Sequence, residues 1–134
     1  MASLPGQPPH ASMIPETLIT ALSNHLDPVH MVRETSVTLF ITDRPAVTDA
    51  MIIEGGSDGL TLPFREIWDR SQRADARHIL LMHTHPSGDP RPSTQDIRVT
   101  RRLCVFMRPR GMRLMDHIIL TQDQYFSFRL HRML

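Results

Sequence analysis

The chain contains no lysine, a single cysteine, few aromatic residues and no long hydrophobic run. One cysteine among 134 residues, Cys104, excludes both an intramolecular disulfide framework and a zinc site built from cysteines. It suits a reducing cytosol, so we expect a cytoplasmic protein. No run of about 18 apolar residues occurs, which excludes a membrane-spanning helix. The first residues lack the basic region and the apolar core of a secretory signal.

Positive charge comes from arginine alone and is unevenly distributed. Residues 1–60 contain two arginines and seven acidic residues, whereas residues 61–134 contain thirteen arginines and seven acidic residues. The absence of lysine is typical of the codon bias of a GC-rich genome. The arginines are not interleaved with aromatic residues, as a stacking surface for nucleic acid requires. We therefore expect DNA binding to be weak or absent.

The length fits one domain, since domains commonly have about 100–150 residues. Residues 1–13 contain three prolines and no periodic hydrophobicity, which predicts an extended or disordered lead-in to a domain at 14–134. Helices and strands intermix along the chain, so we predict an α/β fold with one mixed sheet flanked by helices. Apolar periodicity predicts helices at 15–26, 64–76 and 93–107 and strands at 36–42, 50–54, 78–82, 117–120 and 125–128.

One segment carries the residue types of a metal site. His83 and His85 follow the strand predicted at 78–82, and their spacing places both side chains on one side of an extended chain. Ser93 is placed to cap the next helix, and Asp96 lies in its first turn. Two histidines, a carboxylate and an open position for water form a catalytic zinc site. The residue types leave a second interpretation open, in which the histidines are structural and Ser93 and Asp96 form only a local capping box.

The segment from His83 to Asp96 reads His-x-His-Pro, six residues, Ser, two residues and Asp. This pattern resembles the signature of the JAMM (JAB1/MPN) metalloproteases. Its inner residues, together with 63–67, 116–119 and 125–128, are similar to the RadC-type branch, and the similarity covers about residues 50–130. Thr84 departs from the asparagine usual in that branch, although threonine is common in eukaryotic-type members. The helix-hairpin-helix region of full-length RadC-type proteins is not seen in the first 30 residues.

The resemblance implies a JAB1/MPN architecture of the cytidine-deaminase-like kind and a zinc-dependent metallopeptidase. His83, His85 and Asp96 would bind Zn²⁺, water would be the fourth ligand, and Ser93 would donate a hydrogen bond to that water or to the developing oxyanion. The expected reaction is hydrolysis of amide or isopeptide bonds in a peptide or protein substrate. Two alternatives are a DNA-repair accessory protein without peptidase activity and a metal-stabilised pseudo-enzyme that mediates protein contacts.

The family also uses an upstream glutamate as the general base. Glu34, just before the strand predicted at 36–42, is the best candidate, Glu54 is the alternative and Glu16 is a distant third. For His117 we favour a structural role over contact with a metal ligand. Cys104 is predicted to be a core residue of a helix rather than a nucleophile.

Overall fold

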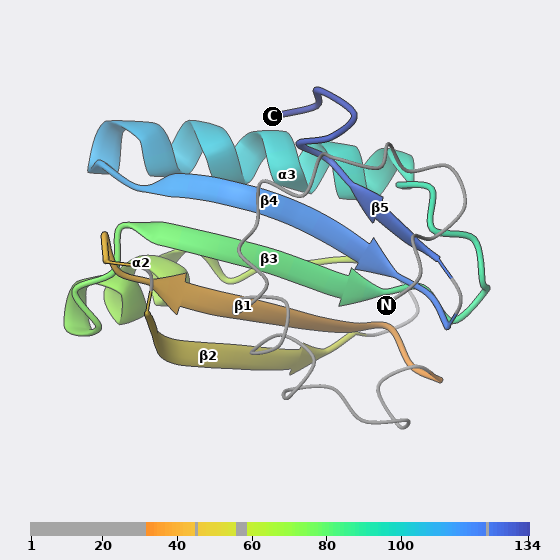
Figure 1. Ribbon diagram of the computed structural model, residues 1–134, viewed down its shortest axis with the longest axis horizontal. Coiled ribbons are helices and arrows are strands. Elements are labelled where there is room, and N and C mark those ends of the chain that lie inside the picture. Colours follow the sequence, from red (N-terminus) through yellow and green to blue (C-terminus); the bar gives the residue numbers. More distant parts are fainter. Residues whose placement is uncertain (1–31, 45, 56–58, 123) are drawn as a thin grey trace.

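The computed structural model describes residues 32–44, 46–55, 59–122 and 124–134 (Figure 1). The predicted lead-in at 1–13 and the predicted helix at 15–26 lie outside these residues. In the described part of the chain, no helix is long and apolar enough to cross a membrane. The elements are, in order, β1 (Thr35–Ile41), β2 (Val47–Glu54), α2 (Phe64–Arg73), β3 (His78–Thr84), α3 (Thr94–Met107), the short 3₁₀ helix η2 (Arg108–Arg110), β4 (Arg113–Leu120) and β5 (Tyr125–Ser127).

The strands form a mixed sheet in the order β2-β1-β3-β4-β5. The β1 strand pairs antiparallel with both β2 and β3, β3 pairs parallel with β4, and β4 pairs antiparallel with β5. The parallel pair is joined by α3, as a crossover between parallel strands requires. The predicted α/β fold with one mixed sheet is therefore confirmed. The start of β1, the end of β3 and the start of α3 all lie at the same end of the molecule (Figure 1).

Strand β3 is central to the core, because its apolar residues alternate between two packed faces. Ile79 and Leu81 face one hydrophobic cluster together with residues of α2 and α3, whereas Leu80 and Met82 face a second cluster. All four side chains have no exposed surface. This explains the continuous apolar run of the sequence, since a strand covered on both faces does not alternate with polar residues.

Two strands begin at least three residues earlier than the sequence pattern predicts. The β4 strand starts at Arg113 rather than at residue 117, and β2 starts at Val47 rather than at residue 50. In β4 the exposed Arg113 and the buried carboxylate of Asp116 interrupt the apolar pattern. Asp116 is tolerated in the core because it accepts hydrogen bonds from the backbone N–H groups of His117 (2.7 Å) and Arg129 (2.9 Å) and from the Ser127 hydroxyl. Backbone pairing, rather than the apolar pattern, decides where these strands begin.

Leu103 offers a test of the core between α3 and the sheet. We expect Leu103→Ala to lower the free energy of unfolding by about 2–5 kcal/mol, because the side chain is fully buried and its removal leaves a cavity. Val105 lies on the same helix and is 71% exposed, so Val105→Ala should change this free energy by no more than about 0.5 kcal/mol. Denaturant unfolding measures both, and equal losses in the two variants would contradict the described packing.

Candidate metal centre

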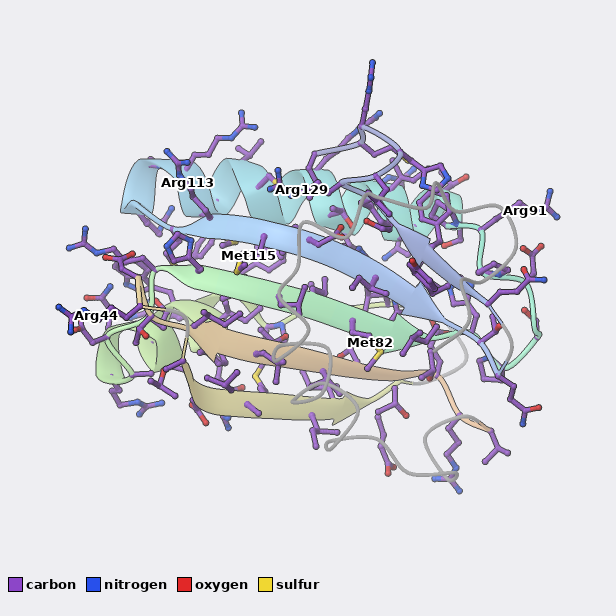
Figure 2. All side chains as sticks on the ribbon, in the orientation of Figure 1. Arg44, Met82, Arg91, Arg113, Met115 and Arg129 are labelled. Carbon is purple, nitrogen blue, oxygen red and sulfur yellow. The ribbon has the colours of Figure 1, made fainter. Side chains whose placement is uncertain are left out.

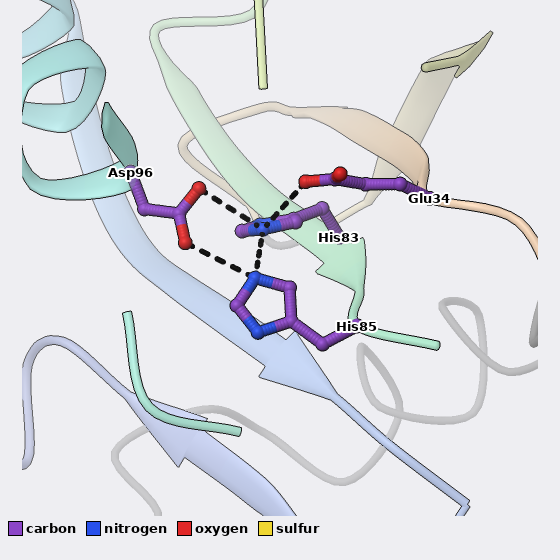
Figure 3. Close-up of side chains that lie close together, drawn as sticks. All are labelled: Glu34, His83, His85 and Asp96. Carbon is purple, nitrogen blue, oxygen red and sulfur yellow. Dashed lines mark hydrogen bonds and ion pairs between the residues drawn. The ribbon is translucent and has the colours of Figure 1, made fainter. Parts of the chain in front are cut away.

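The two histidines of the sequence motif converge at the end of β3. His83 is the penultimate residue of the strand and His85 follows it directly, and their Nε2 atoms lie 2.8 Å apart. Figure 3 shows both rings with their Nε2 atoms directed toward the same point. His83 is fully buried, whereas the side chain of His85 is 14% exposed. The sequence-based expectation that the two side chains share one side of the chain is therefore confirmed.

Asp96 joins this pair from the first turn of α3. Its Oδ1 atom lies 3.3 Å from Nε2 of His83, and its Oδ2 atom lies 3.0 Å from Nε2 of His85. The same residue forms a capping box with Ser93: the Ser93 hydroxyl accepts the Asp96 N–H (3.0 Å), and Asp96 Oδ2 accepts the Ser93 N–H (2.8 Å). The capping box therefore exists, and it orients the carboxylate toward the histidines. A capping box and a metal site are therefore compatible in this geometry.

Glu34 approaches the histidines from the residue before β1. Its Oε1 atom lies 3.6 Å from Nε2 of His83, and the side chain is 23% exposed. Two contacts hold the backbone on either side of it. The Thr84 hydroxyl accepts the N–H of Thr35 (2.9 Å) and donates to the carbonyl of Arg33 (2.8 Å). The carbonyl of Glu34 itself accepts the N–H of Gly55 (2.6 Å).

Thr84 and Gly55 hold the backbone around Glu34, a role that the sequence analysis assigned to neither. Thr84 lies between the two histidines of the motif, and its hydroxyl couples that segment to the peptide groups beside Glu34. A Cβ atom at Gly55 would lie 2.9 Å from the Glu34 carbonyl oxygen, so a larger residue there would displace this backbone. The glycine-rich composition after β2 was the only available signal, and it indicates a turn rather than a close approach.

The structure distinguishes the glutamates named as alternatives. Glu54 lies on β2, one strand further from β3, where it pairs across the ladder with Thr35. Its exposed carboxylate forms an ion pair with Arg33 (3.6 Å). Glu16 lies outside the described residues. Of these candidates, the geometry brings Glu34 to the histidine pair.

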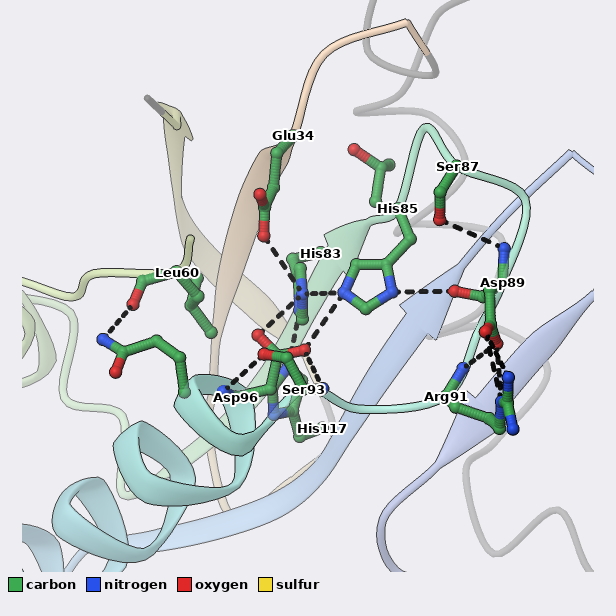
Figure 4. Close-up of polar contacts among 12 residues, drawn as sticks. Glu34, Leu60, His83, His85, Ser87, Asp89, Arg91, Ser93, Asp96 and His117 are labelled. Atoms are coloured by element: carbon green, nitrogen blue, oxygen red, sulfur yellow. Dashed lines mark hydrogen bonds and ion pairs between the residues drawn. The ribbon is translucent and has the colours of Figure 1, made fainter. Parts of the chain in front are cut away.

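The outer nitrogens of both histidines have hydrogen-bond partners. Nδ1 of His85 donates to the carbonyl of Asp89 (2.9 Å), which belongs to the loop after β3. Nδ1 of His83 lies 2.8 Å from Nε2 of His117, a fully buried residue of β4 (Figure 4). For His117 we favoured a structural role, but the structure shows that it contacts His83, a candidate metal ligand. The order Asp116-His117 in a buried strand was its signal in the sequence.

Burial and the neighbouring polar groups shift the pKa values of the site residues in opposite directions. Burial alone would raise the pKa of Asp96, but the adjacent imidazoles of His83 and His85 and the N–H of Ser93 outweigh it and hold that pKa far below its ordinary range. Burial would lower the pKa of His85, but its bonds to Asp96 and to the Asp89 carbonyl raise it above 6.5. Burial lowers the pKa of His117 well below 6.5. Asp96 is therefore ionised and His117 neutral at neutral pH.

These residues fit a divalent metal ion. Glu34, His83, His85 and Asp96 each offer one ligand atom, and the four atoms lie within 4.8 Å of one another. The buried Oδ1 atom of Asp96 has no hydrogen-bond donor among the described residues. A buried carboxylate oxygen without a donor is costly unless a cation satisfies it. Imidazole nitrogens and carboxylate oxygens are ligands that zinc accepts.

Comparison with known proteins shows the family of the chain. A family model described as "RadC-like JAB domain" matches residues 13–133. The chain belongs to this family. It is 32% identical over 99 residues to a "UPF0758 protein" of Alkaliphilus oremlandii, covering 74% of this chain and 43% of that protein. It is 32% identical over 106 residues to a "UPF0758 protein" of Clostridium perfringens, covering 78% and 47%. This RadC-like JAB domain thus spans less than half the length of these curated relatives.

The site predicts metal-dependent stability. Zinc at about 100 times its dissociation constant should raise the free energy of unfolding by about 2.7 kcal/mol. This gain should shrink as the pH falls, because a proton on His85, whose pKa is raised above 6.5, competes with the metal. In the metal-free protein the sign is opposite: the contribution of His85 is present below pH 6.5 and is lost as the pH rises through the raised value.

Denaturant unfolding with and without zinc, at several pH values from about 6 to about 8, measures both trends. His85→Ala should abolish both and serves as the control. A zinc gain that is the same across this range would contradict the assignment of His85 as a ligand.

Proposed function

We propose that this RadC-like JAB domain is a zinc-dependent hydrolase of amide or isopeptide bonds, of the JAMM metallopeptidase type. The observation that carries the proposal is the convergence of His83, His85 and Asp96 on one point, with Glu34 beside them on the more accessible side. His83 and Asp96 are buried, whereas Glu34 and His85 are partly exposed. This arrangement leaves one side of the site open to water and substrate, as catalytic zinc sites require.

Glu34 is the proposed general base. When bound, zinc supplies Lewis-acid chemistry, which acidifies a water molecule and polarises a carbonyl group. The Glu34 carboxylate accepts the proton of the attacking water and passes it to the nitrogen of the leaving amine. Backbone contacts around Glu34 support this role: Thr84 bonds the neighbouring peptide groups of Arg33 and Thr35, Gly55 donates to the Glu34 carbonyl, and together they hold this segment beside the histidines.

Ser93 is the proposed donor to the oxyanion that develops during attack. Its hydroxyl oxygen accepts the N–H of Asp96 in the capping box, and its hydroxyl proton therefore stays available for donation. Ser93 is exposed at the start of α3, so a substrate can reach it. A hydrogen bond to the oxyanion contributes about 10²–10³-fold to the rate in comparable sites.

A metal-stabilised pseudo-enzyme is the second candidate, and one distance favours it. Glu34 Oε1 is close enough to His83 Nε2, at 3.6 Å, to act as a fourth metal ligand instead of a base. A closed set of four protein ligands forms a structural site. The two functions differ in what the loss of the Glu34 carboxylate does to metal affinity.

Three variants separate these candidates. Glu34→Gln should retain zinc and lose about 10²–10⁴-fold in hydrolysis rate, because the general base is removed while the other ligands remain. Asp96→Asn should lose both zinc and activity. Glu54→Gln, the exposed control at the same end of the β1–β2 pair, should retain both. Elemental analysis and assays on isopeptide-linked and C-terminal fusion substrates, with and without chelator, measure these effects.

The outcomes are distinct for the two candidates. If Glu34→Gln loses as much zinc affinity as Asp96→Asn, Glu34 is a ligand and the site is structural. If the wild-type protein binds zinc but cleaves none of the substrates, the hydrolase proposal is contradicted for these bond types.

A DNA-repair accessory function remains the third candidate, and one surface favours it. Arg77, Arg108, Arg113 and Arg129 line a cavity of about 670 Å³ at the start of β3 and β4. In Figure 2, Arg113 lies at the end of the sheet away from Arg91, which belongs to the loop that follows His85. Phosphate binding there would be independent of the metal cluster.

We expect DNA binding to be weak and non-specific. A surface that contacts six phosphates would lose about 10³-fold or more in DNA affinity when the salt concentration rises from 50 to 200 mM. A salt titration with duplex and single-stranded DNA measures this dependence, and Asp96→Asn tests whether the metal cluster takes part. Sub-micromolar binding at physiological salt that Asp96→Asn leaves unchanged would favour the accessory function.

A further inference from the structure

His117 connects the metal cluster to helix α3 through a chain of short contacts. Its Nε2 atom lies 2.8 Å from Nδ1 of His83, and its Nδ1 atom lies 2.7 Å from the hydroxyl of Thr100. That hydroxyl lies 2.6 Å from the backbone carbonyl of Asp96. His117 and Thr100 are almost completely buried, and the His117 ring stacks on Phe128 with centroids 4.4 Å apart. The chain therefore excludes water and has one fixed geometry.

The carbonyl at the end of this chain determines the direction of every hydrogen bond in it. A carbonyl oxygen carries no proton, so the 2.6 Å contact requires the hydroxyl proton of Thr100. The hydroxyl has no second proton, so Nδ1 of His117 must donate to it. A neutral imidazole has one N–H, which leaves a lone pair on Nε2 of His117. The proton of the next contact therefore belongs to Nδ1 of His83.

The tautomer of His83 matters because two arrangements compete. With the proton on Nδ1, the Nε2 lone pair points at Asp96 and Glu34, where a metal ion would lie. With the proton on Nε2, that N–H would face Asp96 Oδ1, 3.3 Å away, and would occupy the metal position. The second arrangement is favourable for an isolated histidine beside a carboxylate. A partner that fixes the proton on Nδ1 is therefore needed.

We propose that Thr100 and His117 are positioning residues that hold His83 in its Nδ1–H tautomer and so prepare Nε2 to bind the metal. The inference rests on the proposed metal site and adds two residues to it. His85 reaches the same tautomer by a shorter route, since its Nδ1 donates directly to the Asp89 carbonyl. Asp96 would thus serve twice, with its carboxylate as a ligand and with its carbonyl as the origin of the chain.

Zinc affinity, measured by competition with a chelator, tests the chain. Thr100→Val removes the hydroxyl with little change of shape, and His117→Phe retains a ring that can stack on Phe128. Both should weaken zinc binding about 10–100-fold, the usual effect of losing a partner that orients a histidine ligand. Thr100→Ser should restore most of the affinity. Thr38→Val is the matched control, because Thr38 is also fully buried and its hydroxyl has no hydrogen-bond partner among the described residues.

A second readout does not depend on the metal. Nitrogen NMR of the metal-free wild-type protein, at a pH where His85 is neutral, should show His83 with its proton on Nδ1. His117→Phe and Thr100→Val should shift His83 toward the Nε2–H tautomer. Thr38→Val should leave the His83 signals unchanged. If His117→Phe does not fold, Thr100→Val carries the comparison.

The results separate this inference from the proposed function. An Nε2–H tautomer of His83 in the wild-type protein would overturn the inference, as would wild-type zinc affinity in both Thr100→Val and His117→Phe. A wild-type protein that binds no zinc but has His83 in the Nδ1–H tautomer would contradict the metal site and not the hydrogen-bond chain.

Discussion

The capping box at the start of α3 is the interaction on which the candidate site depends. Asp96 accepts the N–H of Ser93 in the capping box that begins the helix, and this bond directs the carboxylate toward the end of β3. A helix that started one residue earlier or later would turn the carboxylate away, since successive residues are rotated by about 100° around the axis. Helix stability and metal-site geometry therefore depend on the same hydrogen bonds.

The sheet supplies the rigid part of the site. Residues of β3 are buried on both faces and paired on both edges, so the histidines at its end cannot move without disrupting the core. Strand β1 lies between β2 and β3, and its register opposes Ser36 to His83. This pairing brings Glu34, two residues before Ser36, to the edge where the histidines end. Of the two buried residues, His83 is thus held by a strand and Asp96 by the first turn of α3, whereas the more exposed His85 and Glu34 lie just outside the strand ends.

Hydrogen bonds to backbone carbonyls determine where the histidine protons of the site lie. The outer nitrogen of His85 donates to a carbonyl directly, and that of His83 does so through His117 and Thr100. Because carbonyl groups only accept hydrogen bonds, they determine which nitrogen of each ring carries a proton. The lone pairs that remain face Asp96, which is itself ionised. The site is therefore arranged for a cation by groups that do not contact it.

The sequence by itself determined the type and order of the described elements and predicted His83, His85 and Asp96 as candidate ligands. Apolar runs and the Ser93–Asp96 spacing predicted β3, α3 and the helix cap, because these signals are local. Only the tertiary structure decided between Glu34 and Glu54, since both lie at the same end of neighbouring strands and the strand order alone brings one of them to the histidines. His117 likewise lies 34 residues from His83, and only the parallel pairing of β3 with β4 brings the two rings together.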